Sequence, residues 1–416
     1  MGKIFKGHLL YIPLHAVSTD IAGKILRYNK VTYKTFHREQ SFQMAKVGQG
    51  WLRCPITQTN LKLLKDHQII SIRSTQEDTI TTHSNLKLLP HQKDVIDKLA
   101  DIKPAVALIK APTRFGKSFI IPFISKVYML KTLVLVDTKL QVEQMTSELT
   151  SNLIEGTIHI RTVQSLYRAK DFDYKAYGLL IVDEAHTAVG EEYLKVIYRF
   201  KVNVMIGLTA TPYRADGKSK CVMSLFGNKL IEGFTPNNLK PKFKLVNIPV
   251  YATFTPEGVV HAVVFCSDEI KKIVTQRKSK KLFTMVAVNG IKAQNLLKES
   301  LCDLFDEVII LNSHNKTKLE EINKKKGRIL LIGYKVMLKA ISIPKLEVII
   351  HIGAASTKAN FYQLVGRLKT RIEGVTKTPT FIEVCFQDNP FTSLQLYEWA
   401  EQAHDISIQI INKERI

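Results

Sequence analysis

LLIVDEAH, residues Leu179 to His186, is an apolar run that ends in two adjacent carboxylates. Continuous runs of Val, Ile and Leu are typical of strands that are buried on both faces of a parallel sheet. Asp183 and Glu184 then lie at the carboxyl end of such a strand. There Asp183 can hold a magnesium ion through water while Glu184 orients and deprotonates an attacking water, as phosphoryl transfer requires. Carboxylates that only cap the next helix would explain the same charges, so a second signal is needed.

The second signal is a phosphate-binding loop at KAPTRFGKSF, Lys110 to Phe119. The Gly-Lys-Ser lies between an apolar run and a helix-like segment, where Lys117 can reach phosphates and Ser118 can hold magnesium. The loop is irregular, because Ala111 stands where its first glycine belongs and Arg114 and Phe115 replace the usual small residues. Gly-Lys-Ser alone would fit an ordinary basic turn equally well. With the carboxylates about 65 residues later, the two patterns predict a site that hydrolyses a nucleotide with the help of Mg²⁺.

Strand-like and helix-like segments alternate in two series, one within residues 86–235 and one within residues 256–416. This alternation predicts an α/β protein with two tandem parallel-sheet domains. Residues 236–255, which carry prolines and asparagines, are predicted to be a linker. Periodic apolar residues after Asn389 predict a helical tail on the second domain.

Residues 1–85 differ from the rest and are predicted to form a small basic α+β domain. The first 90 residues hold thirteen Lys and Arg against five Asp and Glu, which suits binding to duplex or junction DNA. Trp51 or Tyr33 could stack on a terminal base pair, although an aromatic residue in a small domain is more often part of its core.

The composition is that of a globular protein with anionic partners. Of the 416 residues 45% are hydrophobic, and 60 Lys and Arg oppose 37 Asp and Glu to give a formal charge of +23. Such a field attracts nucleic acid or an anionic membrane surface. No apolar run approaches the ~18 to 20 residues that span a bilayer, and the N-terminus lacks a leader pattern, so a cytoplasmic protein is expected. The five cysteines lack the paired spacing of a disulfide framework or a zinc site.

Eight short motifs follow one another in the order found in superfamily 2 helicases. They are LLPHQ (Leu88–Gln92), APTRFGKS (Ala111–Ser118), DTKLQVEQ (Asp137–Gln144), RTVQSL (Arg161–Leu166), DEAH (Asp183–His186), TATP (Thr209–Pro212), KAISIP (Lys339–Pro344) and QLVGRLKTR (Gln363–Arg371). The chain therefore resembles this family from Leu88 to Arg371. The resemblance implies two RecA-like domains, with ATP and Mg²⁺ in the cleft that they form.

The resemblance also implies roles for the matching residues. The residues that would bind the nucleotide are Gln92, Thr113, Gly116, Lys117 and Ser118, with Ser118 and Asp183 on the magnesium ion. Those that would carry hydrolysis are Lys117, Asp183, Glu184, Gln363 and Arg367, the last two from the second domain. Those that would couple the nucleotide to the bound strand are His186, Thr209 and Thr211. Those that would contact the nucleic acid are Thr138, Arg161, Gln164 and Lys335.

The last two motifs depart from the family pattern. Thr370 occupies the place of the second arginine, Arg371 lies one position further on, and Ala340 and Ser342 replace the usual Gly and Asp. These changes bear on the rate of hydrolysis more than on its existence, because the main catalytic residues remain.

Within the family, the chain resembles the phage branch-migration helicases of the UvsW type, which share an irregular phosphate loop and a small basic N-terminal domain. This likeness implies a DNA helicase or translocase that remodels forks and Holliday-type junctions in recombination, repair or replication. The wider family implies 3′ to 5′ polarity. A monomer is expected, in the host cytoplasm if the protein is phage-encoded. Two alternatives remain: an RNA helicase, and an ATP-gated nucleic-acid clamp with weak turnover.

Overall fold

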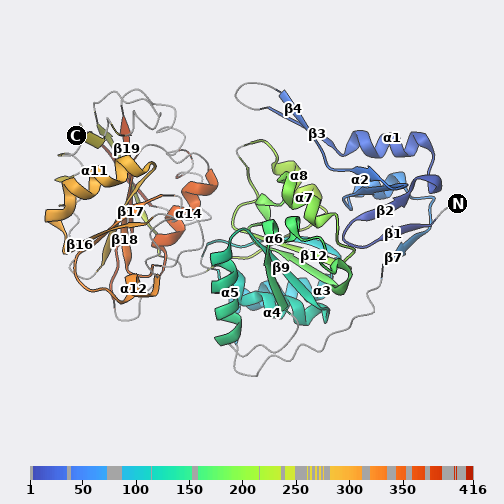
Figure 1. The fold of residues 1–416 in the computed structure, drawn as a ribbon, viewed down its shortest axis with the longest axis horizontal. Coiled ribbons are helices and arrows are strands. Elements are labelled where there is room, and N and C mark those ends of the chain that lie inside the picture. The colour runs from blue at the N-terminus through green and yellow to red at the C-terminus, as the bar shows by residue number, and fades with distance from the viewer. Residues whose placement is uncertain are drawn as a thin grey trace. The chain divides into compact units, whose positions relative to one another are not determined.

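The computed structural model describes most of the chain and divides it into two compact units, Met1–Pro236 and Asn237–Ile416 (Figure 1). The described residues are 3–34, 39–72, 87–113, 115–151, 158–214, 216–235, 239–248, 282–311, 319–334, 343–352, 358–370, 375–386 and 409–415, with residues 260, 263, 264, 268, 271, 272, 275, 398 and 400. Each unit is described below by itself.

The first unit begins with a five-stranded, mainly antiparallel sheet in the order β5-β6-β2-β1-β7. Its strands are β1 (Ile4–Lys6), β2 (Leu10–Pro13), β5 (Lys46–Gly48), β6 (Trp51–Cys54) and β7 (Ile69–Ser71), with helices α1 (Thr19–Tyr28) and α2 (Gln58–Leu63) and a hairpin of β3 (Lys30–Lys34) and β4 (Glu39–Gln43). Alternate residues of β2, such as Leu10 and Ile12, fill a small core of its own. The predicted α+β fold of this part is confirmed.

The same unit continues with a parallel sheet in the order β10-β9-β11-β12-β8-β13. The strands are β8 (Val106–Lys110), β9 (Thr132–Val136), β10 (Ile158–Thr162), β11 (Leu179–Val182), β12 (Val204–Thr209) and β13 (Leu230–Glu232). The helices are α3 (Pro90–Ile102), α4 (Lys117–Tyr128), α5 (Lys139–Ser151), α6 (Val163–Arg168), α7 (Glu191–Ile197) and α8 (Ser219–Leu225).

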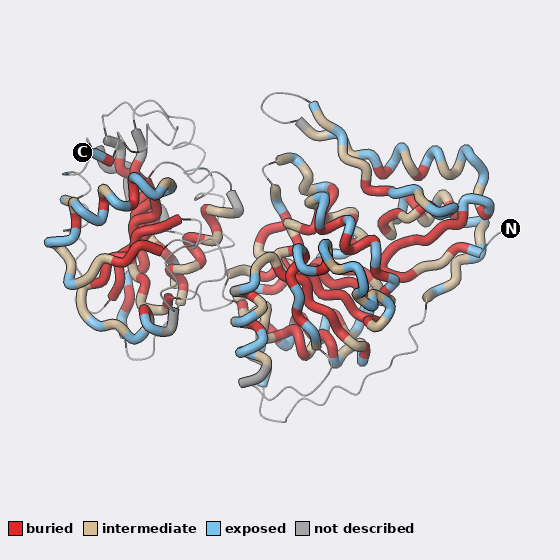
Figure 2. Tube along the Cα trace, viewed as in Figure 1, coloured by how far each residue is buried: buried red, intermediate tan, exposed pale blue. Residues whose placement is uncertain are grey.

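Both faces of this sheet are buried, as its Val-, Ile- and Leu-rich strands predict. Leu180 and Val182 of β11 face a core shared with α6, α7 and α8, whereas Leu179 and Ile181 face a core shared with α3, α4 and α5. Figure 2 shows these central strands as buried along their length. Loops that follow the strands are thereby held on a rigid scaffold.

The N-terminal part shares a core with this sheet and is not a free-standing module. Leu9, Tyr11 and Met44 belong to the same buried cluster as Phe200 and Val202. The sequence could not show this joint packing, because these residues are far apart along the chain.

The second unit is a seven-stranded parallel sheet in the order β16-β17-β15-β18-β19-β14-β20. The strands are β14 (Lys242–Ile248), β15 (Phe283–Val288), β16 (Glu307–Leu311), β17 (Ile329–Gly333), β18 (Leu346–Ile352), β19 (Thr380–Phe386) and β20 (Gln409–Arg415), with helices α11 (Ile291–Leu301), α12 (Leu319–Lys324) and α14 (Lys358–Leu368). Two parallel-sheet α/β domains are thus confirmed.

Two predictions at the edges of this unit are wrong. Residues 242–248, expected within a linker, form β14, which pairs in parallel with β19. Residues 409–415, expected in a helical tail, form β20, which pairs with β14. The pairing satisfies backbone groups that a linker would leave to water, and it overrides the helical period of the tail.

Within the described residues, no helix is long and apolar enough to cross a bilayer.

Candidate functional site

The candidate ATP-binding residues of the first unit gather at one edge of its sheet. Because β8, β11 and β12 run in parallel, the loops that follow them emerge at their common carboxyl edge. The Ala111 amide donates to the Thr209 carbonyl at 2.9 Å, which joins the phosphate loop to the TATP segment. The Asp183 amide donates to the Leu135 carbonyl at 3.0 Å, which fixes the start of the DEAH segment.

The phosphate loop turns at Gly116 and leads directly into helix α4. Gly116 has a φ of 85°, a left-handed conformation that favours glycine. Lys117 is the first residue of α4, and its Nζ lies 3.5 Å from the Ala111 carbonyl oxygen. The free amides of a helix N-terminus and this ammonium group form a site suited to phosphate.

Gln92 holds the loop in place. Its Nε2 donates to the Phe115 carbonyl at 2.8 Å, and its Oε1 accepts from the Leu89 amide at 3.0 Å. A Cβ added at Gly116 would lie 2.5 Å from the Gln92 Nε2, so the position of the Gln92 side chain requires a glycine at residue 116. Gln92 therefore positions the loop in this structure, in addition to the contact with the nucleotide that the resemblance implies.

The irregular residues of the loop have a packing role. Ala111 and Phe115 are buried in the core between α3, α4 and the sheet, with 0% and 1% of their surface exposed. A Cβ at Gly233 would lie 2.8 Å from the Phe115 ring, so the loop is anchored against the strand end at β13. Arg114 lies outside the described residues.

Two hydroxyl groups of the loop are suited to a nucleotide. The Thr113 Oγ1 is buried and has no hydrogen-bond partner among the described residues, a state that costs free energy unless a ligand satisfies it. Burial raises the pKa of Glu148 on α5, and a hydrogen bond from the Ser118 side chain reduces that rise. Glu148 is a neighbour of the site that no motif predicts.

The carboxylates of the DEAH segment are set for a cation. Burial and the nearby Glu184 charge raise the pKa of Asp183 to about 7, although Lys117 opposes the rise. A bound metal ion would favour the charged form of Asp183 in the same way as Lys117. No three His, Cys, Asp or Glu side chains form a metal site in the described parts of the chain. Ser118 and Asp183 are the residues that would hold Mg²⁺.

Glu184 adopts a left-handed backbone conformation, with a φ of 47° and a ψ of 49°. Non-glycine residues rarely hold this conformation, and such strain is concentrated at functional sites. The short helix η3 (Ala185–Thr187) starts directly after it, and the Glu184 Oε2 lies 3.4 Å from the His186 Nδ1. The carboxylate and the imidazole are thus neighbours.

The three residues predicted to couple the site to nucleic acid lie together. The His186 Nδ1 lies 3.2 Å from the Thr209 Oγ1, which donates to the Thr211 carbonyl at 2.9 Å. Arg214 extends this network, because its guanidinium donates to the His186 carbonyl at 2.6 Å and pairs with Asp216 at 2.7 Å.

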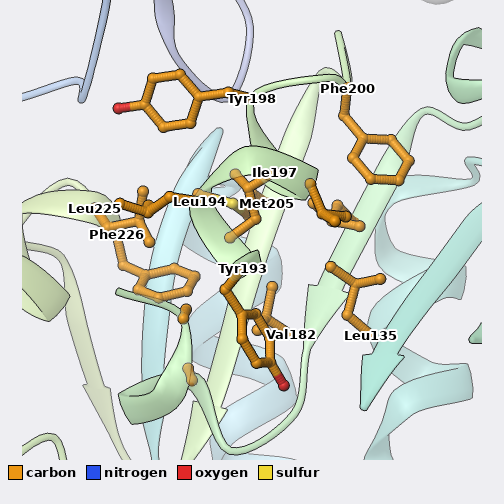
Figure 3. Close-up of a cluster of buried hydrophobic side chains, with 14 of the residues drawn as sticks. Leu135, Val182, Tyr193, Leu194, Ile197, Tyr198, Phe200, Met205, Leu225 and Phe226 are labelled. Atoms are coloured by element: carbon orange, nitrogen blue, oxygen red, sulfur yellow. The ribbon is translucent and has the colours of Figure 1, made fainter. Parts of the chain in front are cut away.

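Helix α7 lies beside this network, and its Tyr193 reaches the next strand. Tyr193 packs with Leu135 and Val182 in the core beneath the DEAH segment (Figure 3). Its Oη donates to the Asp137 carboxylate at the end of β9. Sequence reasoning missed Tyr193 and Arg214, since neither lies within a motif and only the fold brings them to the site.

Of the residues of the first unit that are predicted to contact nucleic acid, one caps a helix and two are exposed. Thr138 caps α5, because its Oγ1 accepts from the Gln141 amide at 3.2 Å. Arg161 at the end of β10 and Gln164 in the first turn of α6 are exposed, so both are available to a ligand. Lys335 lies outside the described residues.

The second unit carries Gln363 and Arg367 four residues apart on α14, so they share one face of that helix. Both are half-buried, while Phe361, Leu364 and Leu368 on the opposite side enter the core. The Thr370 carbonyl accepts from the Lys377 ammonium at 3.1 Å. Ala340, Ser342 and Arg371 lie outside the described residues.

Comparison with known proteins finds a family model and several helicases. The model of the type III restriction enzyme res subunit matches residues 151–214, which include the DEAH and TATP segments. The XPB helicase/translocase subunit of factor IIH from Dictyostelium discoideum is 27% identical over 173 residues, which are 42% of this chain and 21% of that protein. Putative helicase 109L of invertebrate iridescent virus 3 is 24% identical over 178 residues, 38% of this chain and 50% of that protein. The chain thus matches half or less of these relatives' length.

Solved structures share the fold. A putative HsdR fragment of a type I restriction enzyme from Vibrio vulnificus aligns with a TM-score of 0.60 and 18% identity over 78% of this chain and 68% of that chain. T4 UvsW aligns over 100% of this chain and 99% of that chain at 13% identity, with a TM-score of 0.39 that is too low to separate one helicase type from another. The family model, the sequence relatives and the ordered motifs support a superfamily 2 helicase-type hydrolase, and the HsdR alignment shows a shared fold.

Proposed function

We propose that this superfamily 2 helicase-type protein is an ATP-dependent DNA helicase or translocase that unwinds or branch-migrates forked and junction DNA. One observation carries the proposal: the phosphate loop, the DEAH segment and the TATP segment are joined by hydrogen bonds at one sheet edge. The links are the Ala111–Thr209 and His186–Thr209 bonds. A change in the bound phosphates would therefore be transmitted through these bonds from the phosphate loop to the DEAH and TATP segments.

The residues of this edge divide the work of hydrolysis. Lys117 and the N-terminus of α4 bind the phosphates, and Thr113 donates its unpartnered hydroxyl. Asp183 and Ser118 would hold a magnesium ion, which when bound would neutralise phosphate charge. Glu184 accepts a proton on its carboxylate from the attacking water. His186 lies between Glu184 and Thr209 and would report the state of the site.

Nucleic acid as the substrate is supported by charge and exposure. The formal charge of +23 favours a polyanion, and Arg161 and Gln164 are exposed on the unit that holds the ATP site. The choice of DNA rests on the likeness to branch-migration helicases and on the basic N-terminal part. A role in recombination, repair or replication follows from that choice.

The test is steady-state ATP hydrolysis by the full chain. It is measured without nucleic acid and then with single-stranded DNA, a DNA fork, a four-way junction and a matched RNA fork. Strong stimulation by branched DNA that Lys117→Ala abolishes is expected. Lys126→Ala, on the exposed last turn of the same helix, should retain turnover.

Other outcomes would replace the proposal. Greater stimulation by the RNA fork would make the protein an RNA helicase. Tight binding with no turnover, together with strand binding that Glu184→Gln leaves intact, would make it an ATP-gated clamp.

A further inference from the structure

A basic pocket of about 570 Å³ lies between the N-terminal part and the parallel sheet of the first unit. One wall comes from strands β4 to β6 and the other from α7 and the start of α8. The charged side chains that line it are five cations and one carboxylate: Lys46, Arg53, Lys195, Arg199, Lys218 and Glu191. None of the predicted strand-contact residues lines it.

One partly buried and one buried hydrogen bond hold the two walls together. The Arg53 guanidinium donates to the Tyr198 carbonyl at 2.9 Å, and the Tyr198 hydroxyl donates to the Met44 carbonyl. The pocket is therefore a fixed feature of the fold, because its walls share one core.

The positive charge of the pocket is only partly balanced. Glu191 pairs with Lys195 at 2.7 Å. The Lys218 Nζ lies 3.9 Å from Asp216, a carboxylate that already pairs with Arg214, and it sits 4.8 Å from the centre of the Phe42 ring. The Arg53 Nε is buried with no hydrogen-bond partner in the described part of the chain. Five cations against one carboxylate leave the pocket with a net positive charge, which is suited to an anion.

The pocket adjoins the predicted track of the nucleic-acid strand. Helix α6, which carries the exposed Gln164, packs against α7. The Lys195 Nζ lies 5.8 Å from the centre of the Tyr167 ring on α6, and Arg199 donates to the Leu166 carbonyl of α6 at 3.0 Å. Nucleic acid at Gln164 would thus have Lys195 of α7 and Arg199, which follows α7, as its next cationic neighbours.

From this geometry we infer that the pocket binds a sugar-phosphate backbone segment of branched DNA that is separate from the translocated strand. The inference rests on the proposed function. A fork or junction has more than one arm, and a basic surface beside the strand track is suited to the phosphates of an arm that the motor does not follow. The pocket therefore holds an arm of a fork or junction against the N-terminal part.

The experiment compares two double variants of the full chain. Lys46→Ala with Lys195→Ala removes one cation from each wall. Lys24→Ala with Lys98→Ala is the matched control: Lys24 lies in the N-terminal part and Lys98 on α3, each in an exposed pair with an Asp four residues earlier, much as Lys195 pairs with Glu191. Anisotropy of labelled DNA gives affinity for a fork and for single-stranded DNA across a salt series.

The pocket variant, with Lys46→Ala and Lys195→Ala, is expected to bind the fork roughly ten-fold more weakly. The slope of its log affinity against log salt should be reduced by about two. Its affinity for single-stranded DNA should change far less. Lys46→Arg with Lys195→Arg should restore fork binding, and circular dichroism checks that each variant is folded.

The outcomes separate the two proposals. Wild-type protein that binds no DNA overturns the proposed function itself. If forks stimulate ATP hydrolysis by the wild-type protein while the pocket variant and the control variant bind the fork with equal affinity, only the role of the pocket is overturned. If the pocket variant loses affinity for inorganic phosphate but not for the fork, as measured by calorimetry, the pocket is a small-anion site. That result would also overturn the inference about the DNA arm.

Discussion

At the scale of single residues, the irregular phosphate loop is explained by packing. Ala111 and Phe115 are buried where a regular loop has small residues, and Phe115 offers its carbonyl to Gln92. The hydrophobic contacts of Phe115 thus fix a turn that a glycine-rich loop would leave freer. The departures from the family pattern are compatible with a functional site.

Gly116→Ala should weaken both the fold and nucleotide binding. The φ of 85° disfavours alanine, and the new Cβ would displace Gln92 from the Phe115 carbonyl. We expect a loss of roughly 1–3 kcal/mol in the free energy of unfolding and a higher KM for ATP. Gly23→Ala is the control, since nothing lies within 4 Å of its new Cβ on α1, and it should stabilise the protein by about 0.5–1 kcal/mol. Equal effects of the two changes would contradict this account.

Thr113→Val should separate stability from binding. Because the Thr113 hydroxyl has no partner among the described residues, its removal should leave the Tm without nucleotide unchanged or higher. The rise in Tm that ATP and Mg²⁺ cause should become smaller. Thr132→Val should do the opposite, since the Thr132 hydroxyl donates to the Leu130 carbonyl: the Tm falls, while the nucleotide-dependent rise is kept. Thermal melts with and without nucleotide decide the matter.

At the scale of elements, α7 connects the ATP site with the N-terminal part. Tyr193 on α7 reaches Asp137 at the end of β9, while the Ile197 carbonyl at the end of this helix accepts from His8 Nε2 at 3.2 Å. A second connection runs from His186 through Arg214 to Asp216, beside Lys218, whose Nζ lies 5.3 Å from the centre of the Tyr33 ring. The hairpin β3–β4 is thus in contact with the segment that follows TATP.

Acid should loosen the contact between the N-terminal part and α7. His8 is fully buried there, and desolvation lowers its pKa from 6.5 to about 4. Between these values the unfolded state binds more protons, so stability is complete above pH 6.5 and is lost as the pH falls toward 4. From pH 7 to pH 5 the loss should be roughly 2 kcal/mol.

Hydrogen exchange of the β2 amides at pH 7 and pH 5, corrected for intrinsic rates, measures this effect. His8→Gln, which does not titrate, should show a much smaller change in protection between the two pH values. The same change in protection in both proteins would rule out His8 as the cause.

At the scale of the whole molecule, we propose that hydrolysis uses residues of both units. Arg367 lies on α14 of the second unit and shares a helix face with Gln363. If Arg367 stabilises charge in the transition state, Arg367→Ala should lower kcat by roughly 10³-fold or more, with little change in the affinity for ATP. Arg367→Lys should recover only part of kcat, because lysine lacks the planar fork. Rapid kinetics with a fluorescent nucleotide separate binding from turnover, and an equal loss in both would contradict this role.

The sequence by itself determined the two parallel sheets and the residues of the phosphate loop and the DEAH segment. Buried parallel strands need uninterrupted apolar runs, and phosphate chemistry needs a few residue types at fixed local spacing. Both signals are local, so they can be read without the fold. The ordered motifs then indicated the helicase family.

Tertiary structure alone decided the rest. Strands β14 and β20 form because the sheet offers them partners, although their local sequence predicts a linker and a helix. Tyr193, Arg214 and the basic pocket arise from segments far apart in the chain, and their sequence carries no motif. Such contacts depend on long-range packing, which single-chain periodicity does not encode.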